Sequence, residues 1–293
     1  MIHKPWNELD IHQLLALEAV APGLWRTRHG DSNLNARSYG GQLLGQAMMA
    51  GLMDIPDGRE ATMMQFLFLQ GAMPHECVQL QVTSLQEGKR FSSRNVRGSQ
   101  ANGRFVLDAQ VSCAVPMASP THDTPSKAPA GECPEALATL DDVNPLLMRG
   151  VRRLGGYSES RKPSIEFRIP EPDRQLAPST MDGRFRFWMR ATQALPDDPR
   201  IHAAAFAYLS DWWLNFSSLG LHLRSLGELR LYIASLNHAI WLHRPVRADQ
   251  WLHVDSTSPA RAAGLGLSVG AVHDAQGSLL ATITQHCLMA YAD

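Results

Sequence analysis

Three polar side chains stand in apolar surroundings in the second half of the chain: Asp211, Ser235 and Gln285. Asp211 interrupts the stretch AAAFAYLSDWWLNFSS, which is typical of a buried helix because it is apolar on every side. Burying an unpaired carboxylate costs on the order of several kcal/mol. Asp211 therefore needs partners, and polar groups on neighbouring strands could supply them.

Strand alternation indicates where such partners lie. In LATITQHCLMA, Gln285 shares an apolar face with Cys287, and in LRLYIASLNHAIW, Ser235 shares a face with Asn237. If both faces lie against the helix that carries Asp211, a carboxylate, a hydroxyl and an amide converge at one place. We expect a small polar site there.

This group of side chains has a coherent chemistry. Gln285 and Ser235 can hold a water molecule, and hydrogen bonds to Asp211 keep its carboxylate ionised. The carboxylate can then take a proton from the water as it attacks a carbonyl carbon. The residues alone leave a structural alternative open, in which Asp211 caps a backbone or pairs with an arginine and the other two are satisfied core polar groups.

Composition excludes several classes of function. The chain has 293 residues, 44% hydrophobic and 19% charged, with a formal net charge of −1, so a nucleic-acid partner is not expected. The four cysteines are scattered and the histidines lack ligand spacing, which favours neither a disulfide framework nor a metal site, and no cofactor is expected. Neither a signal peptide nor a membrane span is indicated, so we expect a cytoplasmic protein without a membrane partner.

A segment rich in Pro, Ala and Ser divides the chain into two diverged copies of one pattern. Each copy has a helix followed by consecutive strands, with the hairpin turns QANGR and DAQGS at matching places. This order predicts an α+β architecture in which each antiparallel sheet wraps a long helix and the two sheets join into one. We expect a first repeat at 1–116, a variable linker at 117–165, and a second repeat at 166–293 that carries the aspartate.

The two copies can be compared position by position. When the hairpin turns are superposed, Val111 falls where Gln285 lies and Thr62 falls near Ser235, while the first helix, GGQLLGQAMMAG, has no acidic residue. The site is therefore expected once per chain.

Several stretches together resemble the bacterial acyl-CoA thioesterase II family, which has a double hot-dog fold: YGGQLLGQA, EGKRFSSRNV, LPDDPRIHAAAFAYLSDWW, LNHAIWLHRP and GSLLATITQHCLM. They span most of the chain outside the linker. The resemblance implies that Asp211 and Gln285 match the family's catalytic aspartate and glutamine. Ser235 matches its hydroxyl residue, which is usually threonine.

The resemblance also implies an activity, the hydrolysis of fatty acyl-CoA to free fatty acid and coenzyme A, and assembly as a homodimer or homotetramer. Asp211 would activate water or attack the thioester itself to form a mixed anhydride. Two alternatives remain: a non-catalytic acyl-CoA-binding hot-dog protein, and a hot-dog enoyl-CoA hydratase or dehydratase.

The chain departs from the family pattern at three places. Gln65 replaces a common histidine, Gln86 replaces the arginine of a turn, and Asn237 stands where an aspartate is common. Gln65 and Asn237 keep the binding-protein alternative open, and all three departures bear on substrate choice and turnover rate.

Two further groups could take part in the chemistry. Gly40, Gly41 and Gln42 open a helix whose backbone N–H groups could polarise the thioester carbonyl, although a plain tight helix start accounts for them equally well. A second set of residues could bind the phosphates of coenzyme A or could form a solvated strand face: Lys89, Arg90, Arg94 and Arg97. The motif GLSVG has the spacing of a nucleophile elbow, but its serine is expected inside a strand, where that motif does not work.

Overall fold

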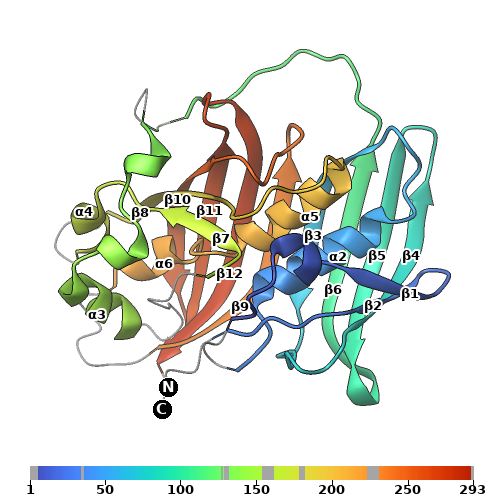
Figure 1. Ribbon diagram of the computed structural model, residues 1–293, viewed down its shortest axis with the longest axis horizontal. Helices are drawn as coiled ribbons and strands as arrows, with labels where there is room; N and C mark the ends of the chain where they lie inside the picture. Colours follow the sequence, from blue (N-terminus) through green and yellow to red (C-terminus); the bar gives the residue numbers. More distant parts are fainter. Residues whose placement is uncertain are drawn as a thin grey trace.

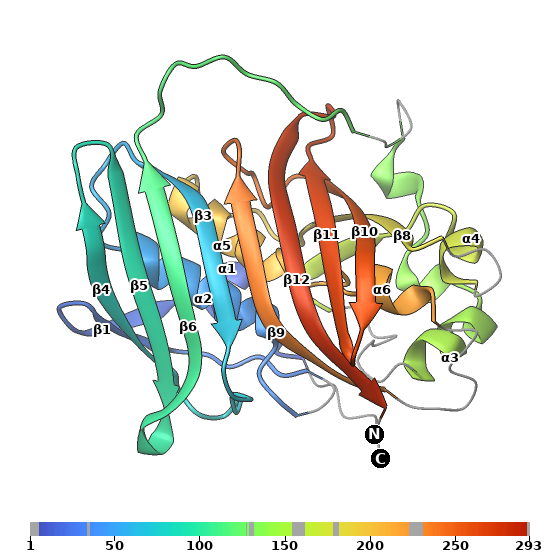
Figure 2. The same ribbon diagram turned by 180° about the vertical axis from the view of Figure 1, so that it is seen from behind.

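The computed structural model describes residues 6–33, 36–126, 128, 132–153, 162–177, 182–222 and 231–291. Its named strands form one antiparallel twelve-stranded sheet in the order β1-β2-β4-β5-β6-β3-β9-β12-β11-β10-β8-β7 (Figure 2). The first half contributes β1 (Leu17–Ala21), β2 (Leu24–Thr27), β3 (Glu60–Phe68), β4 (Gln79–Glu87), β5 (Phe91–Gln100) and β6 (Arg104–Ala114). The second half contributes β7 (Ile165–Arg168), β8 (Arg184–Ala191), β9 (Leu231–Leu242), β10 (Leu252–Ala262), β11 (Leu265–His273) and β12 (Leu279–Tyr291).

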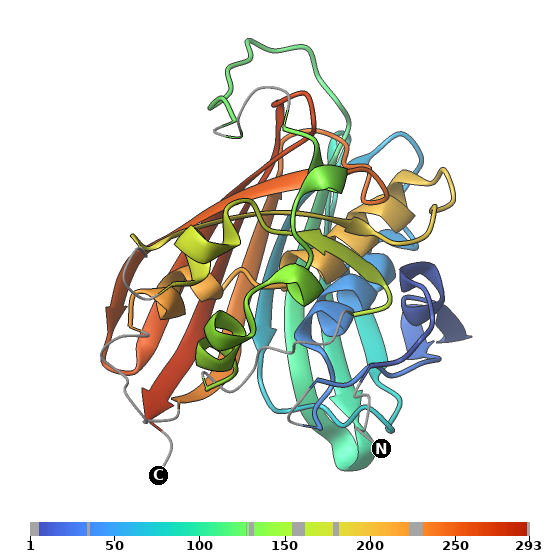
Figure 3. The same cartoon turned by 60° about the vertical axis from the view of Figure 1, so that its left-hand side comes forward.

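Two long helices, α2 (Gly40–Leu52) and α5 (Pro199–Ser210), lie against one face of the sheet and beside each other (Figures 1 and 3). Both are almost entirely buried because each is enclosed by the sheet and by the other helix. No described helix is long and apolar enough to cross a membrane. The shorter elements are α1 (Ile11–Leu14), α3 (Pro145–Arg153), α4 (Pro172–Leu176), α6 (Phe216–Gly220) and the 3-10 turns η1 (Ala101–Gly103), η2 (Pro134–Ala136) and η3 (Leu140–Asp142).

The two halves meet where β3 pairs with β9 at the centre of the sheet. Gln65 lies opposite Ala239, and the flanking pairs are Met63 with Trp241 and Leu67 with Asn237. The pairing therefore relates the two strands by an approximate twofold axis. With one helix packed on each half-sheet, this arrangement confirms the predicted α+β double hot-dog fold. The division at 1–116, 117–165 and 166–293 stays a prediction.

One element differs from its prediction. The stretch AAAFAYLSDWWLNFSS is not a single helix, because α5 ends at Ser210 and α6 begins at Phe216. Between them Trp213 has φ = 59°, in the left-handed region that a bulky residue adopts only when its surroundings hold it there. The Trp213 ring stacks on Phe185 with ring centroids 5.7 Å apart. The break puts Asp211 at the end of a helix instead of inside one.

Candidate functional site

Asp211 lies just past the carboxyl end of α5, at the start of α2. The residue is partly exposed, its Oδ1 accepts a hydrogen bond from Gln285 Nε2, and the backbone N–H of Gly41 donates to its carboxylate. A Cβ atom added at Gly40 would lie only 2.7 Å from Asp211 Oδ2. The carboxylate therefore sits where the two central helices meet, and only glycine leaves it room.

Gln285 joins the three predicted residues into one cluster. Its Nε2 donates to Asp211 Oδ1 and also to Ser235 Oγ, at 2.9 Å. The opposite amide orientation would turn Oε1 toward the carboxylate, so the hydrogen bonds fix this orientation. Oε1 is then buried without a partner among the described residues. The polar cluster therefore keeps one unused acceptor beside its carboxylate and its hydroxyl.

Ser235 reaches the site because β9 contains a β-bulge. Cys287 pairs with Ser235, but His286 pairs with Asn237, so Leu236 is an extra residue in β9. The bulge reverses the alternation, which puts Ser235 on the face of Gln285 and Asn237 on the opposite one. The expectation that Ser235 and Asn237 share a face is therefore wrong. Bulges often re-aim a side chain next to an active site.

The electrostatics of the site favour a proton acceptor. Burial raises the pKa of Asp211 from 3.8 to about 6, against the opposing effects of the Gln285 amide, the Gly41 N–H and the positive charge of Lys162. At pH 7 the carboxylate is mostly ionised and still basic enough to accept a proton. The neighbouring Cys287 thiol has a pKa raised to about 12, chiefly by burial, and so remains protonated.

The first residues of α2 divide into two roles. Gly40 and Gly41 contact the carboxylate directly, as described above. Gln42 does not, because its backbone N–H donates to Tyr39 O and its side-chain Nε2 donates to Leu14 O and His29 O. Gln42 fastens the N-terminal segment to the helix, and we leave it out of the candidate site.

The four predicted coenzyme A ligands do not form one cluster. Lys89 and Arg90 are exposed in the turn between β4 and β5. Arg94 is buried and forms an ion pair with Glu87, a carboxylate that it shares with Arg59. Arg97 points to the other face of β5, is half-exposed, and pairs with Asp108 at 2.9 Å. Arg94 is therefore a structural residue, and the set cannot bind phosphate as a unit.

The first half of the chain has lost all three polar groups at the equivalent place. In β6, Val111 pairs with Met64 and Cys113 with Ala61, as Gln285 pairs with His238 and Cys287 with Ser235 in β12. The register confirms Val111 as the counterpart of Gln285 and replaces Thr62 by Ala61 as the counterpart of Ser235.

The counterpart of Asp211 follows from the same comparison. A Cβ at Gly51 would lie 2.8 Å from Val111 Cγ2, so Gly51 faces Val111 as Asp211 faces Gln285. Gly51, Ala61 and Val111 carry no functional side chain. The polar cluster therefore occurs once within the described part of the chain.

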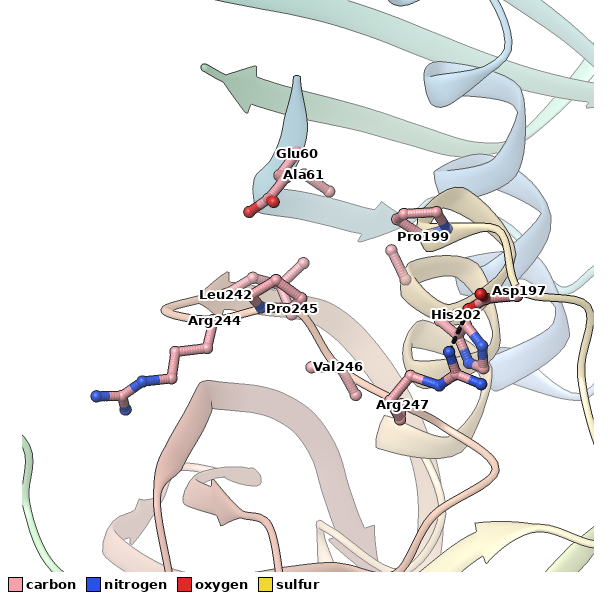
Figure 4. A pocket seen from close by; sticks show the side chains of 11 residues that line it. Glu60, Ala61, Asp197, Pro199, His202, Leu242, Arg244, Pro245, Val246 and Arg247 are labelled. Carbon is pink, nitrogen blue, oxygen red and sulfur yellow. Dashed lines mark hydrogen bonds and ion pairs between the residues drawn. The ribbon is translucent and has the colours of Figure 1, made fainter. Parts of the chain in front are cut away.

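A cavity of about 190 Å³ lies at the start of α5 and is lined in part by Ala61, the counterpart of Ser235 (Figure 4). Asp211 is not among its lining residues. Its walls are mainly apolar and include Ala61 and Val246. The charges at its rim are largely paired: Arg247 with Asp197, and Arg244 with Asp123, at 2.6 Å. His202 and Glu60 also line it and could act as bases, but its two acidic and two basic residues balance, so it has no net charge to attract an ionic ligand.

Two charged residues near Asp211 were missed by the sequence analysis. Lys162 and Asp31 form an ion pair whose side chains have no exposed surface. Lys162 lies in the segment predicted as a linker, and Asp31 in a short loop before α2, so neither periodicity nor spacing pointed to them. Only the fold brings them beside the catalytic candidates.

The three departures from the family pattern lie away from the cluster. Gln65 is exposed between the buried Met64 and Phe66, and Asn237 is on the same outer side of the sheet because of the bulge. Gln86 is at the outer end of β4, where its carbonyl accepts from Arg94 at 3.1 Å. None of them can alter the hydrogen bonds of Asp211 by direct contact.

Two other possible chemistries find no support in the described residues. Ser268, the serine of GLSVG, lies inside β11 and its hydroxyl bonds Ser217 and Ser218, at 2.9 and 2.6 Å. The described parts of the chain also contain no group of three or more His, Cys, Asp or Glu side chains that could hold a metal ion.

Comparison with known proteins places this geometry in a family. Residues 130–289 match the family model described as "Acyl-CoA thioesterase C-terminal domain". The chain is 27% identical over 281 residues to acyl-coenzyme A thioesterase 8 of Rattus norvegicus, with 94% of this chain and 87% of the relative covered.

Solved structures show the same architecture. An acyl-CoA thioesterase II, TesB2, from Mycobacterium marinum superposes with a TM-score of 0.77 at 24% identity, covering 97% of this chain and 98% of the other. A protein with a hot dog fold from Alicyclobacillus acidocaldarius superposes with a TM-score of 0.74 at 16% identity, with the same coverage of both chains. At these identities the two structures support the fold alone.

Proposed function

The chain belongs to the acyl-CoA thioesterase family and hydrolyses acyl-CoA thioesters, and we propose that Asp211 activates the attacking water. The observation that carries this proposal is the amide of Gln285, which bonds Asp211 and Ser235 while its own Oε1 lacks a partner. Asp211 is partly exposed, so we expect a water molecule to approach its carboxylate and donate a hydrogen bond to it.

The reaction then proceeds in two steps. Asp211 takes a proton from the water as the oxygen attacks the thioester carbonyl carbon, which forms a tetrahedral intermediate. When the intermediate collapses, the C–S bond breaks and the proton held by Asp211 passes to the leaving sulfur. The products are a free acid and the thiol of coenzyme A, and Asp211 returns to its ionised state.

Other groups complete the proposed site. The start of α2 at Gly40 adjoins Asp211 Oδ2, which supports a role for this positive helix end near the carbonyl oxygen. Of the four basic candidates, Lys89 and Arg90 are exposed, and we keep them as candidates for binding the phosphates of coenzyme A.

The water mechanism can be separated from direct attack by Asp211 in which water then cleaves the mixed anhydride at the Asp211 carbonyl carbon. Single-turnover hydrolysis in ¹⁸O-labelled water, with enzyme in excess over acyl-CoA, is expected to put the label in the fatty acid and none in Asp211. Label found by mass spectrometry in the Asp211 peptide would show a mixed anhydride and overturn the proposal. Tight acyl-CoA binding with no thiol release would favour the binding-protein alternative instead.

The pH dependence follows from the pKa of Asp211. The ionised form is the base, so kcat/KM for thiol release is expected to be level above pH 7 and to fall about tenfold per pH unit well below pH 6. The profile is measured between pH 4.5 and 8.5 with enzyme that regains full activity on return to pH 7. An acid limb near pH 4, the ordinary range of an exposed carboxyl, would contradict the assignment.

Assembly and location complete the proposal. We infer a homodimer or homotetramer acting in the cytoplasm in fatty-acid metabolism. The four cysteines are free, two exposed and two buried, as is typical of a reducing compartment. The exposed outer side chains Leu67, Trp241 and Tyr232 of the central strands supply apolar surface for association. Light scattering of the purified chain measures the assembly.

A further inference from the structure

Lys162 is a buried cation whose position no part of the mechanism above explains. Its side chain has no exposed surface and is paired with Asp31, which is equally buried. Its Nζ lies 4.2 Å from the ring centre of Trp6 and 4.6 Å from that of Tyr39, within cation–π range of both. Burial lowers the pKa of Lys162 to about 8, so it is still mostly charged at pH 7.

The Lys162–Asp31 pair is connected to both central helices. Asp31 Oδ2 also accepts from Tyr208 OH at 3.0 Å, and Tyr208 stands one turn before Asp211 on α5. On the other side, the Asp31 carbonyl accepts from the N–H of Tyr39 at 2.8 Å, and Tyr39 is the N-cap residue of α2. The pair therefore holds the end of α5 and the start of α2, the two elements that meet at Asp211.

Stability alone is a weak reason to bury this pair. Replacing a buried ion pair by apolar side chains of similar size is often neutral or stabilising, because desolvation offsets the attraction between the charges. Trp6, Tyr39 and Tyr208 already supply an apolar enclosure that a neutral side chain could fill. The burial of the Lys162 charge is better explained by its effect on a neighbouring group, the carboxylate of Asp211.

We propose that Lys162 is a positioning residue for the hydrolysis, because its buried ammonium holds Tyr39 and Tyr208 around Asp31 and its charge favours the ionised form of Asp211. This inference rests on the proposed role of Asp211 as the base. Lys162 acts through Asp211 and needs no contact with the substrate.

Apart from the Lys162–Asp31 pair, the titratable groups facing Asp211 are neutral at pH 7. Burial raises the pKa of Tyr39 well above 10, and that of Cys287 to about 12, so both keep their protons. Asp31 is the ion-pair partner of Lys162. Gln285 and the Gly41 N–H act as uncharged donors. Among the described residues, Lys162 is thus the positive group whose field lowers the pKa of Asp211.

The test is the pH profile of kcat/KM for Lys162→Met beside Lys162→Arg. The methionine variant is expected to move the acid limb upward by about half to one pH unit, because Asp211 loses a favourable charge. At pH 6 this shift lowers kcat/KM about twofold to fivefold beyond any change on the plateau. Lys162→Arg is expected to return the limb to its wild-type position, and the surface variant Arg26→Met to leave the profile unchanged.

If Lys162→Met does not fold, the double variant Asp31→Asn/Lys162→Met removes both charges together and is measured in its place, with Asp31→Asn as reference. A loss of activity that is equal at every pH, with the acid limb unmoved, would mean a purely structural lysine and would overturn the inference. Asp211→Asn belongs in the same series. Wild-type activity in Asp211→Asn would overturn the proposal that Asp211 is the base. That outcome is distinct from the one that overturns the role of Lys162.

Discussion

Asp211→Asn is expected to hydrolyse acyl-CoA on the order of 10²–10⁴-fold more slowly than the wild type, with the loss mainly in kcat. The amide cannot accept a proton from water, yet it has nearly the same size as the carboxylate. Thiol release from short, medium and long acyl-CoAs measures the effect. Asp57→Asn, in an exposed turn, is the matched control and is expected to keep the wild-type rate.

The same variant is expected to be at least as stable as the wild type at pH 7. Because the folded-state pKa of Asp211 is about 6, above its ordinary 3.8, the folded protein binds more protons between these values. Above pH 6, the ionised carboxylate therefore lowers the free energy of unfolding by up to about 3 kcal/mol. This loss of stability is relieved as the pH falls toward 4. Asparagine carries no charge and avoids this loss. A slow variant with a lower Tm would instead indicate that Asp211 has a structural role.

Much of the fold follows from local patterns in the sequence. The turns QANGR and DAQGS join β5 to β6 and β11 to β12, with Gly103 and Gly277 at φ values of 71° and 86°, which favour glycine. Helical and strand periodicities located α2 and the central strands. The order of the twelve strands, and the β3–β9 pairing that joins the two half-sheets, depend on contacts between distant segments. Periodicity does not encode such contacts.

The candidate site could be predicted in part for the same reason. A carboxylate, a hydroxyl and an amide in apolar stretches are visible residue by residue, and the structure brings Asp211, Ser235 and Gln285 together. Strict alternation cannot predict the bulge at Leu236, so the predicted face of Asn237 was wrong. The end of α5 depends on the tertiary packing that holds Trp213.

The buried ion pair shows the limit of sequence reasoning most clearly. Lys162 and Asp31 are 131 positions apart and lie in irregular segments, where charged residues are normally solvated. Their burial is decided by the aromatic residues around them and not by their neighbours in the sequence. Sites assembled from loops and helix ends therefore require the fold before they can be recognised.

Gly41→Ala is expected to lower the free energy of unfolding by about 3 kcal/mol or more, the upper part of the usual range for overpacking. A Cβ at this position would lie 2.2 Å from the backbone oxygen of Tyr208 and 2.5 Å from the ring of Tyr39. A backbone atom of a buried helix cannot move aside alone, so α2 and α5 must separate. Urea denaturation of the purified variant measures the change.

Activity is expected to fall with stability in Gly41→Ala, because the N–H of this residue donates to Asp211 and separation of the helices breaks that bond. Gly88→Ala is the matched control: its nearest neighbour would be Phe91 O at 3.6 Å, an ordinary contact, and both properties should stay at wild-type values. Without the Gly41 donor, the pKa of Asp211 rises, so the acid limb of any residual activity should move upward. Unchanged stability and an unmoved limb would together show that the two helices do not cross closely enough at Gly41 to position the base.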